Sequence, residues 1–226
     1  MPDTVVALHE SVTIAGRVRV DSSPSSANPS PTAFGVVIEP ADGSPTRAGA
    51  RANSDRNDPE RPFAVTGVLP GRYLIRVTTP PGWIVQAVTH AGRDYTDVPL
   101  DLTGPQRLDD VLVTVTRSAA TIVGTVTGPQ GAGAAGVRVA VFPTDRSQWL
   151  DFGISAPRLL DAITSRYGEF QITPLPAGDY FLTIVPDTRG AEWRDPAFFA
   201  ERAATAPRLT VGWGESRTQA LRTDRP

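Results

Sequence analysis

The sequence contains neither cysteine nor lysine. Because none of its 226 residues is cysteine, disulfides, thiolate nucleophiles and zinc–cysteine sites are excluded. All 22 lysine-or-arginine positions are arginine, which rules out Schiff-base catalysis by lysine and a lysine–asparagine isopeptide cross-link. The fold must therefore be held by packing and hydrogen bonds.

Other absences exclude further kinds of site and partner. The two histidines, His9 and His90, are followed three residues later by Val12 and Arg93, so neither starts a His-x-x-Glu metal motif. The formal net charge of −2 draws the chain neither to nucleic acid nor to an anionic membrane. No apolar run approaches the roughly 18 residues of a spanning helix. We expect no cofactor, no metal, no nucleic-acid partner and no transmembrane segment.

Glycine and proline are abundant and are spread through the sequence. Its 20 glycines and 22 prolines separate short β-branched runs, a pattern that predicts an all-β protein with many turns. The predicted strands are Ser11–Val20, Phe34–Ile38, Phe63–Val65, Tyr73–Val77, Trp83–Val88, Val111–Thr116, Thr125–Thr127, Val137–Phe142, Arg208–Val211 and Arg217–Leu221.

The second half of the chain repeats the first. Residues 14–18 (IAGRV) recur as residues 122–126 (IVGTV), and residues 63–73 (FAVTGVLPGRY) align without a gap onto residues 170–180 (FQITPLPAGDY). In both copies the phenylalanine and the tyrosine each start a strand in which every second side chain is expected to point into the core. A glycine that can take positive φ lies between the two strands. We infer an internal duplication, with domains 1–117 and 118–226.

The second copy carries additions that the first lacks. Asp195-Pro196 followed by residues 197–204 predicts a helix, because aspartate caps a helix and proline suits its first position. Phe198 or Phe199 is expected to pack on the sandwich edge. Two long insertions, 144–161 and 186–195, are predicted to be loops.

These motifs resemble a known family. The order G-x-V, V-x-V and F-x-[IV]-x-x-[LV]-x-x-G-x-Y resembles the carboxypeptidase regulatory-like domain, a prealbumin-like (Ig-like, Greek-key) β-sandwich. Residues 137–143 and 167–170 fit it well, whereas the first copy has the longer segment 53–62 where the family has a short turn. The resemblance covers nearly the whole chain, in two tandem copies.

The resemblance implies an accessory role. The family is carried by peptidases, receptors and surface proteins of bacteria, and it lacks the carboxypeptidase zinc ligands. We therefore expect a non-enzymatic, extracytoplasmic module that spaces, stabilises or docks domains of a larger envelope or secreted protein. Residues 1–4 show no signal-peptide pattern, so we interpret Met1 as the start of a fragment.

Candidate catalytic and metal residues are few. Residues 153–157 (GISAP) lack the second glycine of a Gly-x-Ser-x-Gly motif. His90 has Asp94 and Asp97 nearby, as in half of a catalytic triad, but a solvated histidine among turn aspartates is the simpler interpretation. Asn53–Glu60 offers oxygen atoms at alternating positions, as in a calcium loop, or else forms a turn rich in Asn and Asp.

Tryptophans in the second copy suggest an alternative function. A sugar could stack on Trp149, Trp193 and Trp213, with Arg146 and Arg194 in the same loops. The chain would then be a polysaccharide-binding module; the structural alternative is that these loops cap the sandwich. Exposed, coplanar indoles would favour the first, and buried indoles the second.

A third hypothesis is self-assembly or adhesion through a sheet edge. Val5–Leu8 is a short apolar run that could add as a donor strand to an unpaired edge of another molecule.

Overall fold

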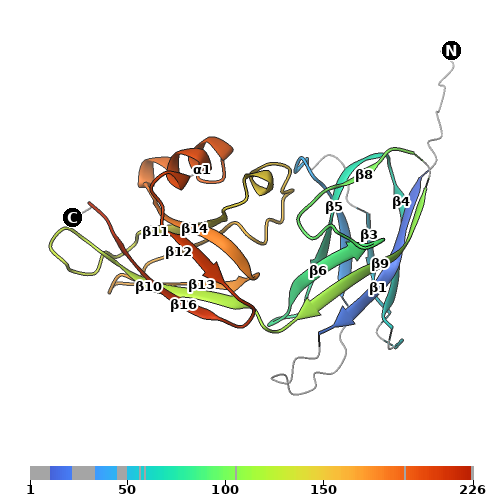
Figure 1. Cartoon of the computed structure of the whole chain (residues 1–226), viewed down its shortest axis with the longest axis horizontal. Coiled ribbons are helices and arrows are strands. Elements are labelled where there is room, and N and C mark those ends of the chain that lie inside the picture. The colour runs from blue at the N-terminus through green and yellow to red at the C-terminus, as the bar shows by residue number, and fades with distance from the viewer. Residues whose placement is uncertain are drawn as a thin grey trace, which may run out of the picture. The chain divides into compact units, whose positions relative to one another are not determined.

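The structure, a computed structural model, describes residues 11–21, 34–44, 50–55, 57–58, 60–104, 106–190 and 192–224. The described chain is an all-β protein built of sandwiches, and it divides into two compact units. The first unit holds most residues up to Val115, and the second holds those from Thr116 on. We call them the first and second modules and describe each by itself (Figure 1).

The first module is a sandwich of a five-stranded and a four-stranded sheet. Its strands are β1 (Val12–Val20), β2 (Gly35–Pro40), β3 (Ala50–Asn53), β4 (Pro62–Val68), β5 (Gly71–Thr78), β6 (Ile84–His90), β7 (Arg93–Asp94), β8 (Leu100–Leu102) and β9 (Arg107–Thr116). The strand orders are β4-β1-β9-β6-β7 and β3-β2-β5-β8. The predicted join at residues 117–119 follows β9.

The second module has a three-stranded and a four-stranded sheet, in the orders β13-β10-β16 and β12-β11-β14-β15. The strands are β10 (Ala120–Thr127), β11 (Arg138–Pro143), β12 (Leu160–Ile163), β13 (Glu169–Leu175), β14 (Gly178–Val185), β15 (Arg208–Val211) and β16 (Ser216–Arg222). Two 3₁₀ helices, η1 (Arg146–Trp149) and η2 (Asp187–Arg189), and one α-helix, α1 (Pro196–Ala203), complete it.

The two modules share one strand plan. In each, the first strand pairs with the fourth at matching positions: Gly16 lies opposite Phe63 and Gly124 opposite Phe170. The modules differ in their connections, and η1 between β11 and β12 is one such difference. Between β5 and β8 the first module inserts the β6–β7 hairpin, which extends one sheet, whereas between β14 and β15 the second inserts η2 and α1.

The first and last strands of each module lie side by side and run parallel. β1 pairs with β9, and β10 pairs with β16 over seven consecutive residues. A glycine makes this approach possible in both modules. A Cβ atom on Gly16 would lie 1.9 Å from the carbonyl oxygen of Val111, and one on Gly124 would lie 1.8 Å from that of Gln219.

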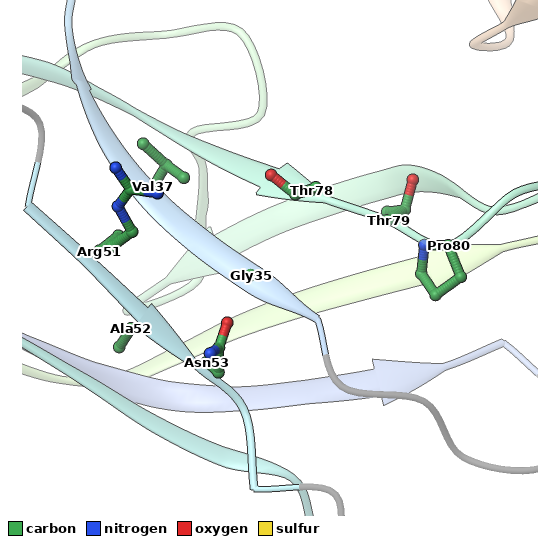
Figure 2. Close-up of a pocket in the computed structure, with 8 residues that line it drawn as sticks. All are labelled: Gly35, Val37, Arg51, Ala52, Asn53, Thr78, Thr79 and Pro80. Carbon is green, nitrogen blue, oxygen red and sulfur yellow. The ribbon is translucent and has the colours of Figure 1, made fainter.

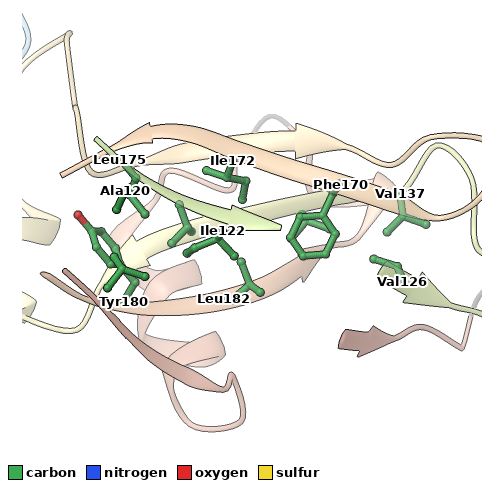
Figure 3. Packing of buried hydrophobic residues seen from close by; sticks show 12 residues of the cluster. Ala120, Ile122, Val126, Val137, Phe170, Ile172, Leu175, Tyr180 and Leu182 are labelled. Carbon is green, nitrogen blue, oxygen red and sulfur yellow. The ribbon is translucent and has the colours of Figure 1, made fainter. Parts of the chain in front are cut away.

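The core of the second module lies between its two sheets, and the repeated residues form it. Ile122, Phe170, Tyr180 and Leu182 are each at most 5% exposed, and Figure 3 shows their side chains gathered between the strands. Burying such side chains stabilises the fold by about 1.5–3 kcal/mol each. The Tyr180 hydroxyl donates to the Pro176 carbonyl oxygen at 2.8 Å, so its polar end is satisfied inside the core.

The predicted helix is confirmed. The Asp195 carboxylate accepts a hydrogen bond from the Ala197 backbone N–H at 2.7 Å, and Pro196 occupies the first turn. Both Phe198 and Phe199 are fully buried. No helix among the described residues is long and apolar enough to cross a membrane.

Several short strands were not among those predicted. β3 and β12 are four residues long, and β7 and β8 are two and three residues long. Each exists because a longer strand beside it supplies the hydrogen-bonding partner, as β2 does for β3 and β11 for β12. Local sequence patterns carry little information about such strands.

We predict that Gly124→Ala destabilises the second module by about 3 kcal/mol or more, because the added methyl group overlaps the β16 backbone. Urea unfolding followed by tryptophan fluorescence measures the loss, since Trp149, Trp193 and Trp213 all belong to this module. Gly190→Ala is the control, because its Cβ makes only an ordinary contact at 3.6 Å; its effect should stay within about 0.5 kcal/mol. Equal effects of the two substitutions would show that the close approach is unimportant.

Candidate functional site

The long loops of the second module fold against its own sheet. Together with α1 they cover the face of the β12-β11-β14-β15 sheet that points away from the sandwich core, as Figure 1 shows for α1. The buried residues of this second cluster, which we call the aromatic layer, are Ala140, Phe142, Trp149, Leu159, Phe181, Val185, Trp193, Phe198 and Phe199. This sheet therefore has an apolar cluster on each face.

Trp149 and Trp193 lie inside the aromatic layer. They are 4% and 5% exposed. The Trp149 indole N–H donates to the Pro143 carbonyl oxygen at 2.8 Å, and its ring meets Phe142 edge-on with centroids 5.9 Å apart. Because a sugar needs an accessible ring face, this burial favours the structural alternative for these loops.

Of the remaining residues of the predicted sugar site, the two arginines lie beside the buried tryptophans and Trp213 lies elsewhere. The guanidinium groups of Arg146 and Arg194 lie 5.4 Å and 5.0 Å from the ring centroids of Trp149 and Trp193, a cation–π distance. The two arginines thus cover the indoles. Trp213 is half-buried in the turn between β15 and β16, outside the aromatic layer.

Asp145 fixes the start of η1, the helix that carries Trp149. Its carboxylate accepts hydrogen bonds from the Ser147 hydroxyl at 2.7 Å and from the Ser147 backbone N–H at 2.9 Å. These bonds, the hydroxyl first, lower the pKa of Asp145 below its ordinary value of 3.8. The charged form therefore favours the folded state.

The two carboxylates considered for catalysis have structural partners, whereas the Nδ1 atom of His90 is buried without a hydrogen-bond partner among the described residues. Asp94 accepts hydrogen bonds from the backbone and hydroxyl of Thr96, and Asp97 forms an ion pair with Arg76 at 3.6 Å. His90 pairs with Arg93 across the β6–β7 hairpin. Both carboxylates therefore stabilise the turn after β7.

The loop considered for calcium forms two short turns. Asp55 accepts a hydrogen bond from the Asn57 N–H at 2.9 Å, and Asp58 accepts one from the Glu60 N–H at 2.8 Å. Such bonds define turns made by aspartate. Within the described residues, no group of three or more histidine, aspartate or glutamate side chains is placed to hold a metal ion.

A hollow of about 390 Å³ lies on the outer face of the β3-β2-β5-β8 sheet. Its centre is Gly35 on β2, with Asn53 of β3 and Thr78 of β5 on either side. Figure 2 shows this row and, farther along the strands, the Arg51 guanidinium beside Val37. Sequence reasoning missed this hollow, although a glycine inside an apolar strand marks it.

Among the described residues, no strand pairs with the outer edge of β16, the last strand of the second module. β16 ends its sheet, whereas β6 covers the corresponding edge of β9 in the first module. β16 has no buried residue. The predicted donor run, Val5–Leu8, lies outside the described residues.

No protein-family model and no curated protein matches the chain. Similar solved structures include a Streptococcal ancillary pilin (14% identity, TM-score 0.37, 96% of this chain and 63% of that one) and the minor pilin of Streptococcus agalactiae (13%, 0.36, 94% and 94%). A putative carbohydrate binding protein from Pseudomonas aeruginosa is also similar (14%, 0.29, 47% and 89%). The chain spans less than two thirds of the ancillary pilin, and likenesses at this level say nothing about function.

We predict that Trp149→Ala destabilises the second module by about 3–5 kcal/mol, since it empties a well-packed site. Trp213→Ala, which removes a half-buried ring outside the aromatic layer, should cost less than half as much. Urea unfolding at one pH compares them. A Trp149→Ala protein as stable as the wild type would mean that the aromatic layer does not support the fold.

The lowered pKa of Asp145 makes its contribution pH-dependent. A carboxylate with a lowered pKa stabilises the fold at pH values above its pKa in the unfolded state. This stabilisation is lost as the pH falls through its pKa in the folded state. The free energy of unfolding of wild type relative to Asp145→Asn should therefore be larger at pH 6 than at pH 2.5, because asparagine caps without a charge. Denaturation at both pH values measures it, and a constant difference would contradict the coupling.

Proposed function

We propose that the chain is a structural, non-catalytic pair of sandwich modules that holds other domains of a larger surface or secreted bacterial protein apart and transmits tension between them. The observation that carries the proposal is the parallel pairing of the first and last strands in each module. The resemblance to carboxypeptidase regulatory-like domains supports the extracytoplasmic setting and the other domains of the parent protein as partners.

The pairing sets where the chain enters and leaves a module. Because β10 and β16 run in the same direction, the chain enters at one end of their ladder and leaves at the opposite end. β1 and β9 do the same in the first module. A module of this kind spans its own length between its two connections, which is what a spacer requires.

The same geometry resists pulling. A force on the two ends of the second module slides β10 along β16, so all the ladder bonds from Thr121–Ser216 to Thr127–Arg222 bear the load together. A force on neighbouring ends of the two strands would open the bonds one after another. Forced unfolding depends on the unfolding barrier, and breaking many bonds at once raises that barrier.

The aromatic layer supports the same function. Trp149, Leu159 and Trp193 come from the insertions considered for binding, yet their side chains fill a second core against β11 and β14. A sheet with apolar packing on both faces bends and opens less readily than one with a wet face.

Single-molecule pulling tests the proposal, and the absence of cysteine makes site-specific attachment simple. Thr121→Cys with Arg222→Cys loads the β10–β16 ladder from opposite ends; Thr127→Cys with Arg222→Cys loads it from one end. The first pair should give an unfolding force several times higher at the same pulling rate, because the bonds share the load. Equal forces would contradict a load-bearing role, and matched urea midpoints would show that both variants keep the fold.

A further inference from the structure

Gly35 is a glycine that the first module does not need for its fold. A Cβ atom there would make only ordinary contacts, 3.4 Å from the Thr78 Cβ, and its φ is not positive. Gly16, in contrast, has no room for one. Gly35 begins β2 and is paired on both sides, where glycine costs up to about 0.5–1 kcal/mol relative to alanine, so its presence there calls for a reason other than space or backbone conformation.

The second module shows what occupies this position when no hollow is left. Gly35 pairs with Thr78 as Arg138 pairs with Val185, at the same place in ladders that both end on a proline–tyrosine pair. The Arg138 side chain covers the sheet there and forms an ion pair with Asp161 on the edge strand. The first module has neither of these side chains.

The edge-strand position that carries Asp161 in the second module carries a cation in the first. Arg51 pairs with Val37 as Asp161 pairs with Ala140, so the acid of one module is replaced by a base in the other. Arg51 is exposed and forms no ion pair with another described residue. Among the described residues, Arg51 therefore lacks an ion-pair partner of the kind that Arg138 has in the second module.

Two neutral polar groups converge over the glycine. A Cβ atom on Gly35 would lie 3.6 Å from the Asn53 Oδ1 and 3.7 Å from the Thr78 Oγ1. Neither side chain is hydrogen-bonded to another described residue. A hydroxyl group resting on Gly35 can therefore donate to Asn53 and exchange a hydrogen bond with Thr78.

We propose that this hollow binds a carboxylated sugar, with the carboxylate on Arg51 and ring hydroxyls on Asn53 and Thr78. The two binding positions are two residues apart along the strands, about 7 Å, and a hexuronic acid carries both groups on one rigid ring. Gly35 provides the flat floor that lets the ring approach the sheet. The site is independent of the load-bearing function, since none of its residues belongs to the β1–β9 ladder.

A sugar fits better than an acidic peptide. β2 is hydrogen-bonded on both sides, by β3 and β5, so a peptide cannot add to it through its backbone, the usual source of peptide affinity at a sheet. Over Gly35, recognition must therefore come from side chains, and those on either side of it are the amide of Asn53 and the hydroxyl of Thr78. These groups pair with the hydroxyls of a sugar.

Isothermal titration of the whole chain with a soluble oligogalacturonate tests the proposal. We expect saturable binding that weakens with salt, at least about tenfold weaker binding of the neutral oligogalactan, and a similar loss in Arg51→Gln. Gly35→Gln, which places an uncharged side chain where the second module has Arg138, should abolish binding without lowering the melting temperature. Arg17→Gln, an exposed arginine on the other sheet, should bind within about twofold of wild type.

Three results would overturn the proposal. One is no binding of oligogalacturonate at millimolar concentration. The second is binding that survives both Gly35→Gln and Arg51→Gln, which would place the sugar elsewhere. The third is equally tight binding of polyglutamate, which would make the hollow a site for acidic peptides. None of these results bears on the unfolding force of either module, so the two proposals stand or fall separately.

Discussion

Both modules depend on one backbone contact, the approach of the first strand to the last at Gly16 and at Gly124. Any side chain at these positions would push the strands apart and break the parallel ladder. That ladder joins the first and last strands of each module within one sheet. In a protein without disulfides or lysine cross-links, this non-covalent pairing holds the two end strands of each module together.

Much of the fold was predictable because its signals are local. Alternating β-branched residues located the long strands, and Asp195-Pro196 located α1. The shared residues of the two halves now lie in matching registers. Edge strands such as β3 escaped prediction because their partner, and not their composition, makes them strands. The domain limits drawn from the repeat remain a prediction, with β9 and β10 on either side of the join.

The candidate sites were less predictable, because burial depends on what packs from elsewhere. Tryptophan in a long loop suits binding and capping equally well, and only the position of α1 over β11 decides between them. One signal was present: residues 137–142 are apolar on both faces apart from Arg138, as expected of a strand covered twice. The hollow at Gly35 was harder to predict, because it arises from the absence of a side chain at this position and not from the presence of one.

The connection between β5 and β8, and its counterpart between β14 and β15, carries unrelated segments of nearly equal length, residues 79–99 and 186–207. In one module the segment widens a sheet, and in the other it adds a third layer. Neither changes the shared strands, which lie before and after it. The sandwich thus has an exchangeable segment, where new surface can be acquired or transplanted while the points at which the chain enters and leaves the module stay the same.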